Sequence, residues 1–84
     1  MKTEIKFKDE NEFEIMGMQI ANYFEKVLGV YTPGELKSHY SIKNENPVEI
    51  EIYHKERTIF IDGKTNHKKS FLEKIAKEPS EVLV

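Results

Sequence analysis

Apolar and polar residues alternate along the middle of the chain with the period of two that is typical of half-buried β-strands. The alternation runs over residues 35–43, 48–54 and 58–62, and a shorter one covers residues 3–8. Alternate side chains of a strand point to opposite faces of a sheet, so each segment has one apolar face. The residues predicted to face inward are Thr3, Ile5, Phe7, Leu36, Ser38, Tyr40, Ile42, Val48, Ile50, Ile52, Ile59 and Ile61.

Two further segments have the helical period, in which apolar residues recur every three or four positions. We expect the first helix to begin at Asp9, which has Glu12 three residues later as in a capping box, and to run to Leu28 with Gly29 as its C-cap. The second is capped by Thr65 or Asn66 and stops before Pro79. Their apolar stripes are Phe13, Met16, Ile20, Phe24 and Val27 in the first helix and Phe71, Leu72 and Ile75 in the second.

Turn signals separate these elements. Residues 31–34 and 44–47 contain Pro-Gly and Asn-Pro, and Lys55-Glu56 suits a four-residue hairpin loop better than a two-residue one. The predicted order is therefore β-α-β-β-β-α. The fold class is α+β: a single domain over residues 1–84, with an antiparallel sheet, two helices packed on one face, and an apolar C-terminal tail at residues 78–84 that includes Val82-Leu83-Val84.

Composition narrows the class of protein. The chain has 84 residues, of which 38% are hydrophobic, too many for an intrinsically disordered chain. It has no Cys, and small secreted domains usually depend on disulfides, so we expect a cytoplasmic protein. No run approaches the roughly 18 apolar residues of a membrane span, and the charged N-terminal residues do not resemble a secretion signal.

The sequence offers little catalytic chemistry. The three His residues are not spaced as metal ligands, and there is no Cys nucleophile and no Gly-rich phosphate loop. Glu49 and Glu51 share a strand face, but Lys37 and His39 of the neighbouring segment are placed to pair with them across the sheet. We therefore predict a protein that is not an enzyme and uses neither a metal nor a cofactor.

The start of the second helix is unusual. Lys68 and Lys69 lie in its first turn with Lys64 just upstream, although a cation at that end opposes the helix dipole. Free backbone N–H groups and three lysines suit a phosphate, whereas the alternative is that the lysines are only solvated. The adjacent aromatic residues Tyr53 and Phe60 could stack on bases or simply stabilise the hairpin.

The α-β-β-β-α part of this order, with Lys68-Lys69 opening the last helix, resembles the double-stranded-RNA-binding domain. With the first strand included, the order also resembles ribosome hibernation factors. The chain departs from the RNA-binding domain at residues 44–47, where that family has Gly-Pro-x-His, and at residues 71–74, where its second helix is rich in alanine. The resemblance implies an RNA- or ribosome-binding protein that uses Lys68 and Lys69, to which the anion site described above adds Lys64.

The first helix carries a second unusual feature. A step of 100° per residue places Ile15 and Met18 on the face opposite the core, with Asn22 beside them and with Glu14 and Glu25 on the polar rim. An apolar centre within a polar rim is typical of a protein-binding patch, although single exposed apolar residues are also normal.

The leading hypothesis is a non-catalytic module that docks stoichiometrically on another protein through this patch. The net charge of −2 and the acids on the rim favour a partner with a basic surface. Inhibitors and adaptors act in this way, including host-directed and anti-defence proteins of phages. RNA or ribosome binding is the alternative; no membrane is expected as a partner, and the protein itself is expected to be a monomer or a weak homodimer.

Overall fold

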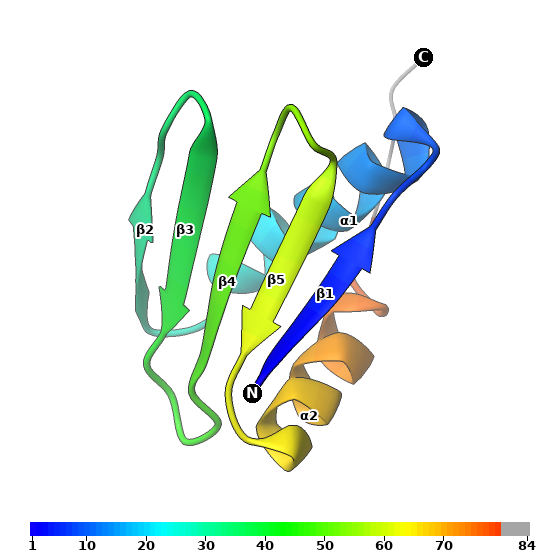
Figure 1. The fold of residues 1–84 in the computed structure, drawn as a ribbon. Helices are drawn as coiled ribbons and strands as arrows, with labels where there is room; N and C mark the ends of the chain where they lie inside the picture. The colour runs from blue at the N-terminus through cyan, green and yellow to red at the C-terminus, as the bar shows by residue number, and fades with distance from the viewer. Residues whose placement is uncertain (80–84) are drawn as a thin grey trace.

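The computed structural model describes residues 1–79, which form one five-stranded antiparallel sheet and two helices. The strand order across the sheet is β1-β5-β4-β3-β2, so β1 and β2 are its edges (Figure 1). The elements are β1 (Lys2–Lys6), α1 (Glu10–Phe24), β2 (Gly29–Thr32), β3 (Lys37–Ile42), β4 (Val48–Tyr53), β5 (Thr58–Asp62) and α2 (Thr65–Ile75).

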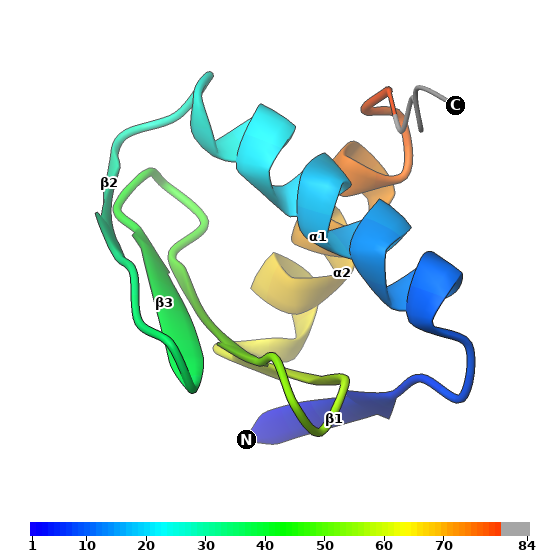
Figure 2. The same cartoon turned by 90° about the horizontal axis from the view of Figure 1, so that it is seen from above.

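Both helices lie on the same side of the sheet, as the view from above shows (Figure 2). The predicted α+β class, the antiparallel sheet and the single helical layer are confirmed. The tail Val82-Leu83-Val84 lies outside the described residues. In the part of the chain that the structure covers, no helix is long and apolar enough to cross a membrane.

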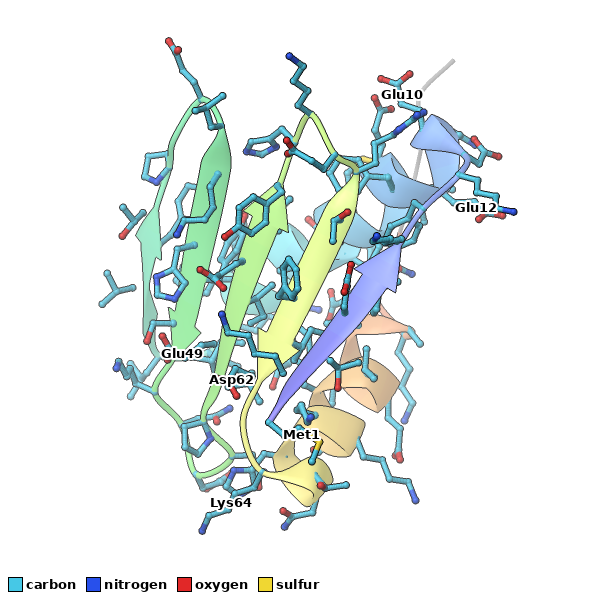
Figure 3. The ribbon with its side chains drawn as sticks, viewed as in Figure 1. Met1, Glu10, Glu12, Glu49, Asp62 and Lys64 are labelled. Atoms are coloured by element: carbon cyan, nitrogen blue, oxygen red, sulfur yellow. The ribbon has the colours of Figure 1, made fainter. Side chains whose placement is uncertain are left out.

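Helix α1 begins where the sequence predicted. Asp9 is its N-cap, and its carboxylate accepts a hydrogen bond from the N–H of Asn11 at 2.8 Å. Glu10 and Glu12, labelled in Figure 3, lie in the first turn, where carboxylates interact favourably with the helix dipole. The predicted end at Leu28 is wrong, because the helix ends at Phe24 with Glu25 as its C-cap.

The residues beyond α1 form strand β2, which the sequence reading assigned to a helix cap and a turn. Gly29 does not close the helix; it opens the strand opposite Ile42 of β3. A Cβ at this position would clash with the carbonyl oxygen of Ser41 and would lie 2.7 Å from the Phe24 ring. Glycine is therefore required here by the close approach of β3 and α1, so the observed order is β-α-β-β-β-β-α.

The β4–β5 hairpin has the predicted four-residue loop, residues 54–57, and Arg57 adopts a positive φ of 49° within it. Helix α2 starts at Thr65, earlier than a cap at Thr65 or Asn66 would place it, and its N-cap is Lys64, whose side chain makes no capping hydrogen bond. Neither Thr65 nor Asn66 caps the helix, since both lie inside it.

One apolar core joins the sheet to both helices. Ile50, Ile59 and Ile61 are fully buried in the central strands and face Ile20 of α1. Burial of each such side chain contributes on the order of 1.5–3 kcal/mol. Leu36, predicted to face inward, is instead exposed because β3 begins one residue later. The core residues are Phe13, Ile20, Tyr23, Tyr40, Ile42, Val48, Ile50, Ile52, Ile59, Ile61, Phe71 and Ile75.

Gly29 of β2 and Gly17 in the middle of α1 give a matched test of this packing. We expect Gly29→Ala to destabilise the protein by about 1–3 kcal/mol, because the added methyl group meets the backbone of β3. Gly17→Ala should stabilise it by about 0.5–1 kcal/mol, since Gly17 is inside a helix and its Cβ would meet no atom within 4 Å. Urea unfolding measures both; equal effects of the two substitutions would contradict the assignment of β2.

Candidate functional site

Strand β2 is an exposed edge of the sheet, and four of the five exposed large apolar residues in the described part of the chain lie in it or beside it in sequence. Val30 and Tyr31 in the strand are 58% and 43% exposed, and Leu28 and Leu36 on either side of it are each 75% exposed. Residues 27–34 contain no charged side chain, in a chain in which 33% of residues are charged. This apolar edge, Leu28, Val30, Tyr31 and Leu36, is called the β2 edge below.

The backbone of β2 has hydrogen-bonding groups directed away from the sheet. The N–H of Lys43 donates to the C=O of Leu28 at 2.8 Å, and the same register places Val30 opposite Ser41. Hydrogen-bonded pairs alternate with non-bonded pairs along an antiparallel ladder. The N–H and C=O groups of Val30 therefore face β3, whereas those of Gly29 and Tyr31 face outward.

The opposite edge, β1, is protected. The N–H of Phe7 donates to the C=O of Arg57 at 3.0 Å, so the same alternation directs the backbone groups of Lys2, Glu4 and Lys6 outward. All three residues are charged, and charged side chains on an edge strand oppose pairing with a further strand. The two edges of this sheet thus differ in their readiness to accept another strand.

Lys68 ties β1 to helix α2. Its side chain is not solvated, since the residue is only 8% exposed. Its ammonium group donates to the carbonyl oxygen of Met1 at 2.7 Å and to the hydroxyl of Thr3 at 2.9 Å. These bonds tie the first turn of α2 to β1 and account for a cation at the positive end of a helix. The expectation that Lys68 is a surface group is therefore corrected.

Lys64 and Lys69 are exposed, as predicted. Lys64 lies at the tip of the molecule beyond β5 (Figure 3). Asp62, two residues before Lys64, pairs with the N-terminal ammonium of Met1 at 3.3 Å. The predicted anion site thus retains two of its three lysines at the surface, next to a carboxylate.

A groove of about 540 Å³ opens between α1 and the strands β2, β3 and β4. We call it the sheet groove. Its α1 side includes Gly17, which contributes no side chain, and its sheet side includes Tyr31 of the β2 edge. The complete lining is Phe13, Glu14, Gly17, Met18, Ala21, Tyr31, Ser38, Tyr40, Ile52 and His54.

Few polar groups reach into this groove. The hydroxyl of Ser38 lies 2.8 Å from Nε2 of His54, and Ser38 is only 4% exposed. The ring of Tyr40 stacks on that of Tyr31 with the ring centroids 4.4 Å apart. Burial, helped by the neighbouring Tyr31 phenol, raises the pKa of Tyr40 from its ordinary value of 10 to about 12.

The predicted patch on α1 is divided between two grooves. Met18 lines the sheet groove, whereas Ile15 lines a second groove of about 340 Å³ between α1 and α2, where it faces Leu72. Both side chains are half-buried. Ile15 and Met18 are thus each partly covered, and each borders a different groove.

Of the other residues predicted for that patch, Glu14 and Asn22 stay close to Met18, since each lines a groove together with it. The side-chain amide of Asn22 donates to the carbonyl oxygen of Pro79 at 2.9 Å, which ties α1 to the segment after α2. Glu14 is exposed on the sheet groove. Glu25 is exposed at the C-cap of α1, close in sequence to the β2 edge.

The outer face of the sheet is a network of paired charges. Glu51 binds Lys2 and Lys37, each at 3.1 Å, and these bonds lower the pKa of its carboxyl. Glu49, labelled in Figure 3, accepts from the Ser41 hydroxyl at 2.6 Å and lies 2.9 Å from His39. The predicted cross-strand pairing of both glutamates is confirmed.

The aromatic pair on this face is confirmed as well. The rings of Tyr53 and Phe60 meet edge to face with their centroids 5.4 Å apart. Lys2 and Lys37 lie over these rings at 5.7 and 5.8 Å from the centroids. The rings are thus already in contact with each other and with two cations.

The described residues contain no group of three or more side chains of the His, Asp or Glu type placed to hold a metal ion. Comparison with protein-family models, with curated proteins and with solved structures finds no match for this chain. Function must therefore be argued from the β2 edge and the sheet groove themselves.

Sequence reasoning missed both of these features. The uncharged segment 27–34 was the available signal for the β2 edge, but its Gly and Pro residues also match a helix cap and a turn. The contact between Ser38 and His54 depends on the β3–β4 register, which no motif in the sequence specifies.

The internal role of Lys68 can be tested against its neighbour. Lys68→Met should destabilise the protein by about 1–3 kcal/mol, because the Met1 carbonyl and the Thr3 hydroxyl lose their buried donor. Lys69→Met changes an exposed side chain and should stay within about 0.5 kcal/mol of wild type. Guanidinium unfolding measures the free energy of unfolding of both variants. A Lys68→Met variant as stable as wild type would contradict the link between α2 and β1.

The Glu51 ion pairs predict a dependence of stability on pH. The folded-state pKa of Glu51 lies below its ordinary value of 4.5, so its contribution is present above that pH and is lost as the pH falls through the lowered value. Glu51→Gln should make the free energy of unfolding fall less steeply with acid. Glu45→Gln makes the same change at an exposed turn residue away from both lysines. Urea unfolding at several pH values measures how the free energy of unfolding changes with pH. The same pH dependence in both variants would contradict the prediction.

Proposed function

We propose that this protein is a protein-binding module that accepts an extended segment of a partner protein as an added strand at the β2 edge. The observation that carries the proposal is the contrast between the two edges of the sheet. At β1 the outward backbone groups belong to Lys2, Glu4 and Lys6, whereas at β2 they belong to Gly29 and Tyr31. Proteins normally block strand edges with charge, and β2 lacks that protection.

Strand addition uses these backbone groups directly. The N–H and C=O groups of Gly29 and of Tyr31 supply donors and acceptors at alternate positions, which is the arrangement that a partner strand requires. The main-chain hydrogen bonds of such an interface supply affinity, and side chains on the two faces of the new strand supply specificity.

The side chains around the edge favour an apolar partner segment. Val30 faces the same side of the sheet as its neighbour Ser41, and its exposed surface is available to a side chain of an added strand. Leu28, just before β2, is exposed as well, and Leu36 is exposed in the connection to β3, where its carbonyl oxygen accepts from the N–H of His54. Large exposed apolar residues gathered in one place are typical of interaction sites.

Charges beside the edge favour a basic residue in the partner. Glu25 and Glu35 are exposed on either side of the β2 edge. Of the lysines near the edge, Lys26 pairs with Glu78 at 2.9 Å and Lys37 pairs with Glu51 at 3.1 Å. Lys43, in contrast, is exposed beside Leu28 and offsets the acid at that end. The partner segment is therefore expected to have an apolar centre and a basic residue at the end that meets Glu35, in accord with charge complementarity at interfaces.

The proposed mode of action is stoichiometric binding without turnover. It retains the class of function expected from the sequence and moves the contact surface from Ile15 and Met18 to the β2 edge. RNA or ribosome binding remains the alternative, with Lys64 and Lys69 as its exposed cations.

A charge placed on β2 tests the proposal. Val30→Lys should weaken partner binding at least about ten-fold, because it places an unpaired charge in the new interface. Val30 is exposed, so the fold should be unaffected. Ala76→Lys adds the same charge at an exposed position beyond α2 and should bind like wild type. The measurement is affinity capture of proteins from the source cells, quantified for wild type and both variants after nuclease treatment.

Two results would overturn the proposal. One is a set of captured proteins that Val30→Lys retains as well as wild type does. The other is capture that disappears with nuclease and with the double variant Lys64→Glu/Lys69→Glu, which would assign the protein to the RNA-binding alternative because phosphate contacts depend on these cations.

A further inference from the structure

We propose that the sheet groove is a binding site for a free small molecule that has a compact apolar body and carries a basic amine. This site differs from the strand-addition surface, because the groove extends away from the edge over β3 and β4. Tyr31 is the residue that the two sites share. The proposal does not depend on the identity of any protein partner.

The size and lining of the groove suit a small ligand. Its volume of about 540 Å³ falls within the range of roughly 300–1,000 Å³ that is usual for such sites. Phe13, Ile52 and the Tyr40 ring supply apolar contact surface. Met18 adds a flexible side chain, and methionine adapts readily to the shape of a bound apolar group.

Gly17 makes room for the ligand on the α1 side. A Cβ built at this position meets no atom within 4 Å, so the helix surface there is open. Glycine in the middle of a helix costs about 0.5–1 kcal/mol relative to alanine. Here it leaves the groove unobstructed, and no contact of the described core requires it.

The polar groups of the groove indicate how a ligand would be held. Ser38 and His54 form a hydrogen-bonded pair at 2.8 Å, and the second ring nitrogen of His54 can accept from or donate to a ligand according to its tautomer. A small number of placed polar groups in an apolar lining is the usual arrangement in specific ligand sites.

The charge of the lining selects the sign of the ligand. Glu14 is the one carboxylate of the groove, and the lining includes neither Lys nor Arg. The Tyr40 phenol carries no charge at neutral pH, as is usual for tyrosine, and burial raises its pKa further, to about 12, so it contributes no competing charge. An amine is therefore favoured over a neutral group, and a carboxylate is disfavoured.

Three probes with the same apolar body and different charges test the site. They are 2-naphthylmethylamine, 2-naphthalenemethanol and 2-naphthoate, each titrated into the ¹⁵N-labelled protein. We expect saturable shifts of the backbone amides of Gly17, Ser38 and His54. Affinity should decrease from the amine to the alcohol to the carboxylate.

Two variants locate the site, and a third acts as control. Gly17→Leu should abolish the shifts for all three probes, because it fills the groove while leaving a good helix former in α1. Glu14→Gln should weaken the amine about two- to five-fold and leave the alcohol unchanged, as expected for an exposed ion pair. Val30→Lys should bind all three probes like wild type, so failure of strand addition and failure of this site are distinguishable.

Several outcomes would overturn the proposal. These are probe binding by a folded Gly17→Leu variant, equal affinity for the amine and the carboxylate, and no saturable shift with any probe. Shifts of the groove residues that depend on protein concentration without probe would instead identify a second copy of the chain as the occupant.

Discussion

An antiparallel sheet with one apolar face must have that face covered, and this requirement governs the rest of the structure. Ile50, Ile59 and Ile61 present the apolar face in the central strands, and Ile20 of α1 and Phe71 of α2 cover it. Two helices do not cover all of five strands. The sheet groove is the part of that face, over β2, β3 and β4, that α1 leaves open.

The two edges of the sheet also differ in how far the helices cover them. α2 lies close enough to β1 for Lys68 to donate to Met1 and Thr3, so that edge is tied to a helix. No comparable bond from a helix side chain reaches β2 in the described part of the chain. An edge strand without charged side chains or a covering element exposes backbone groups that can pair with a further strand. The sheet groove also borders β2, so the proposed strand-addition site and the proposed ligand site lie on the same half of the molecule.

The charged side chains on the outer face of the sheet pair with one another, so they stabilise the sheet and its register and are not offered to a partner. Glu51 with its two lysines, and Glu49 with Ser41 and His39, satisfy one another across neighbouring strands. Cross-strand pairs of this kind fix which residues lie opposite each other. The paired charges leave the apolar edge and the groove as the surfaces where a partner or a ligand would gain most from contact.

The sequence by itself determined the elements whose side chains follow a clear period. Strands β4 and β5, the start of α1 at Asp9 and the single helical layer could all be predicted, because alternation and capping are local properties of the chain. Tertiary structure decided the rest. Gly29 became part of a strand only because Ser41 and Phe24 approach it closely, Lys68 became an internal donor only because β1 lies beside α2, and Ser38 met His54 through the β3–β4 register. Each of these outcomes depends on residues distant in the chain, and a local pattern contains no information about which distant backbone will arrive beside it.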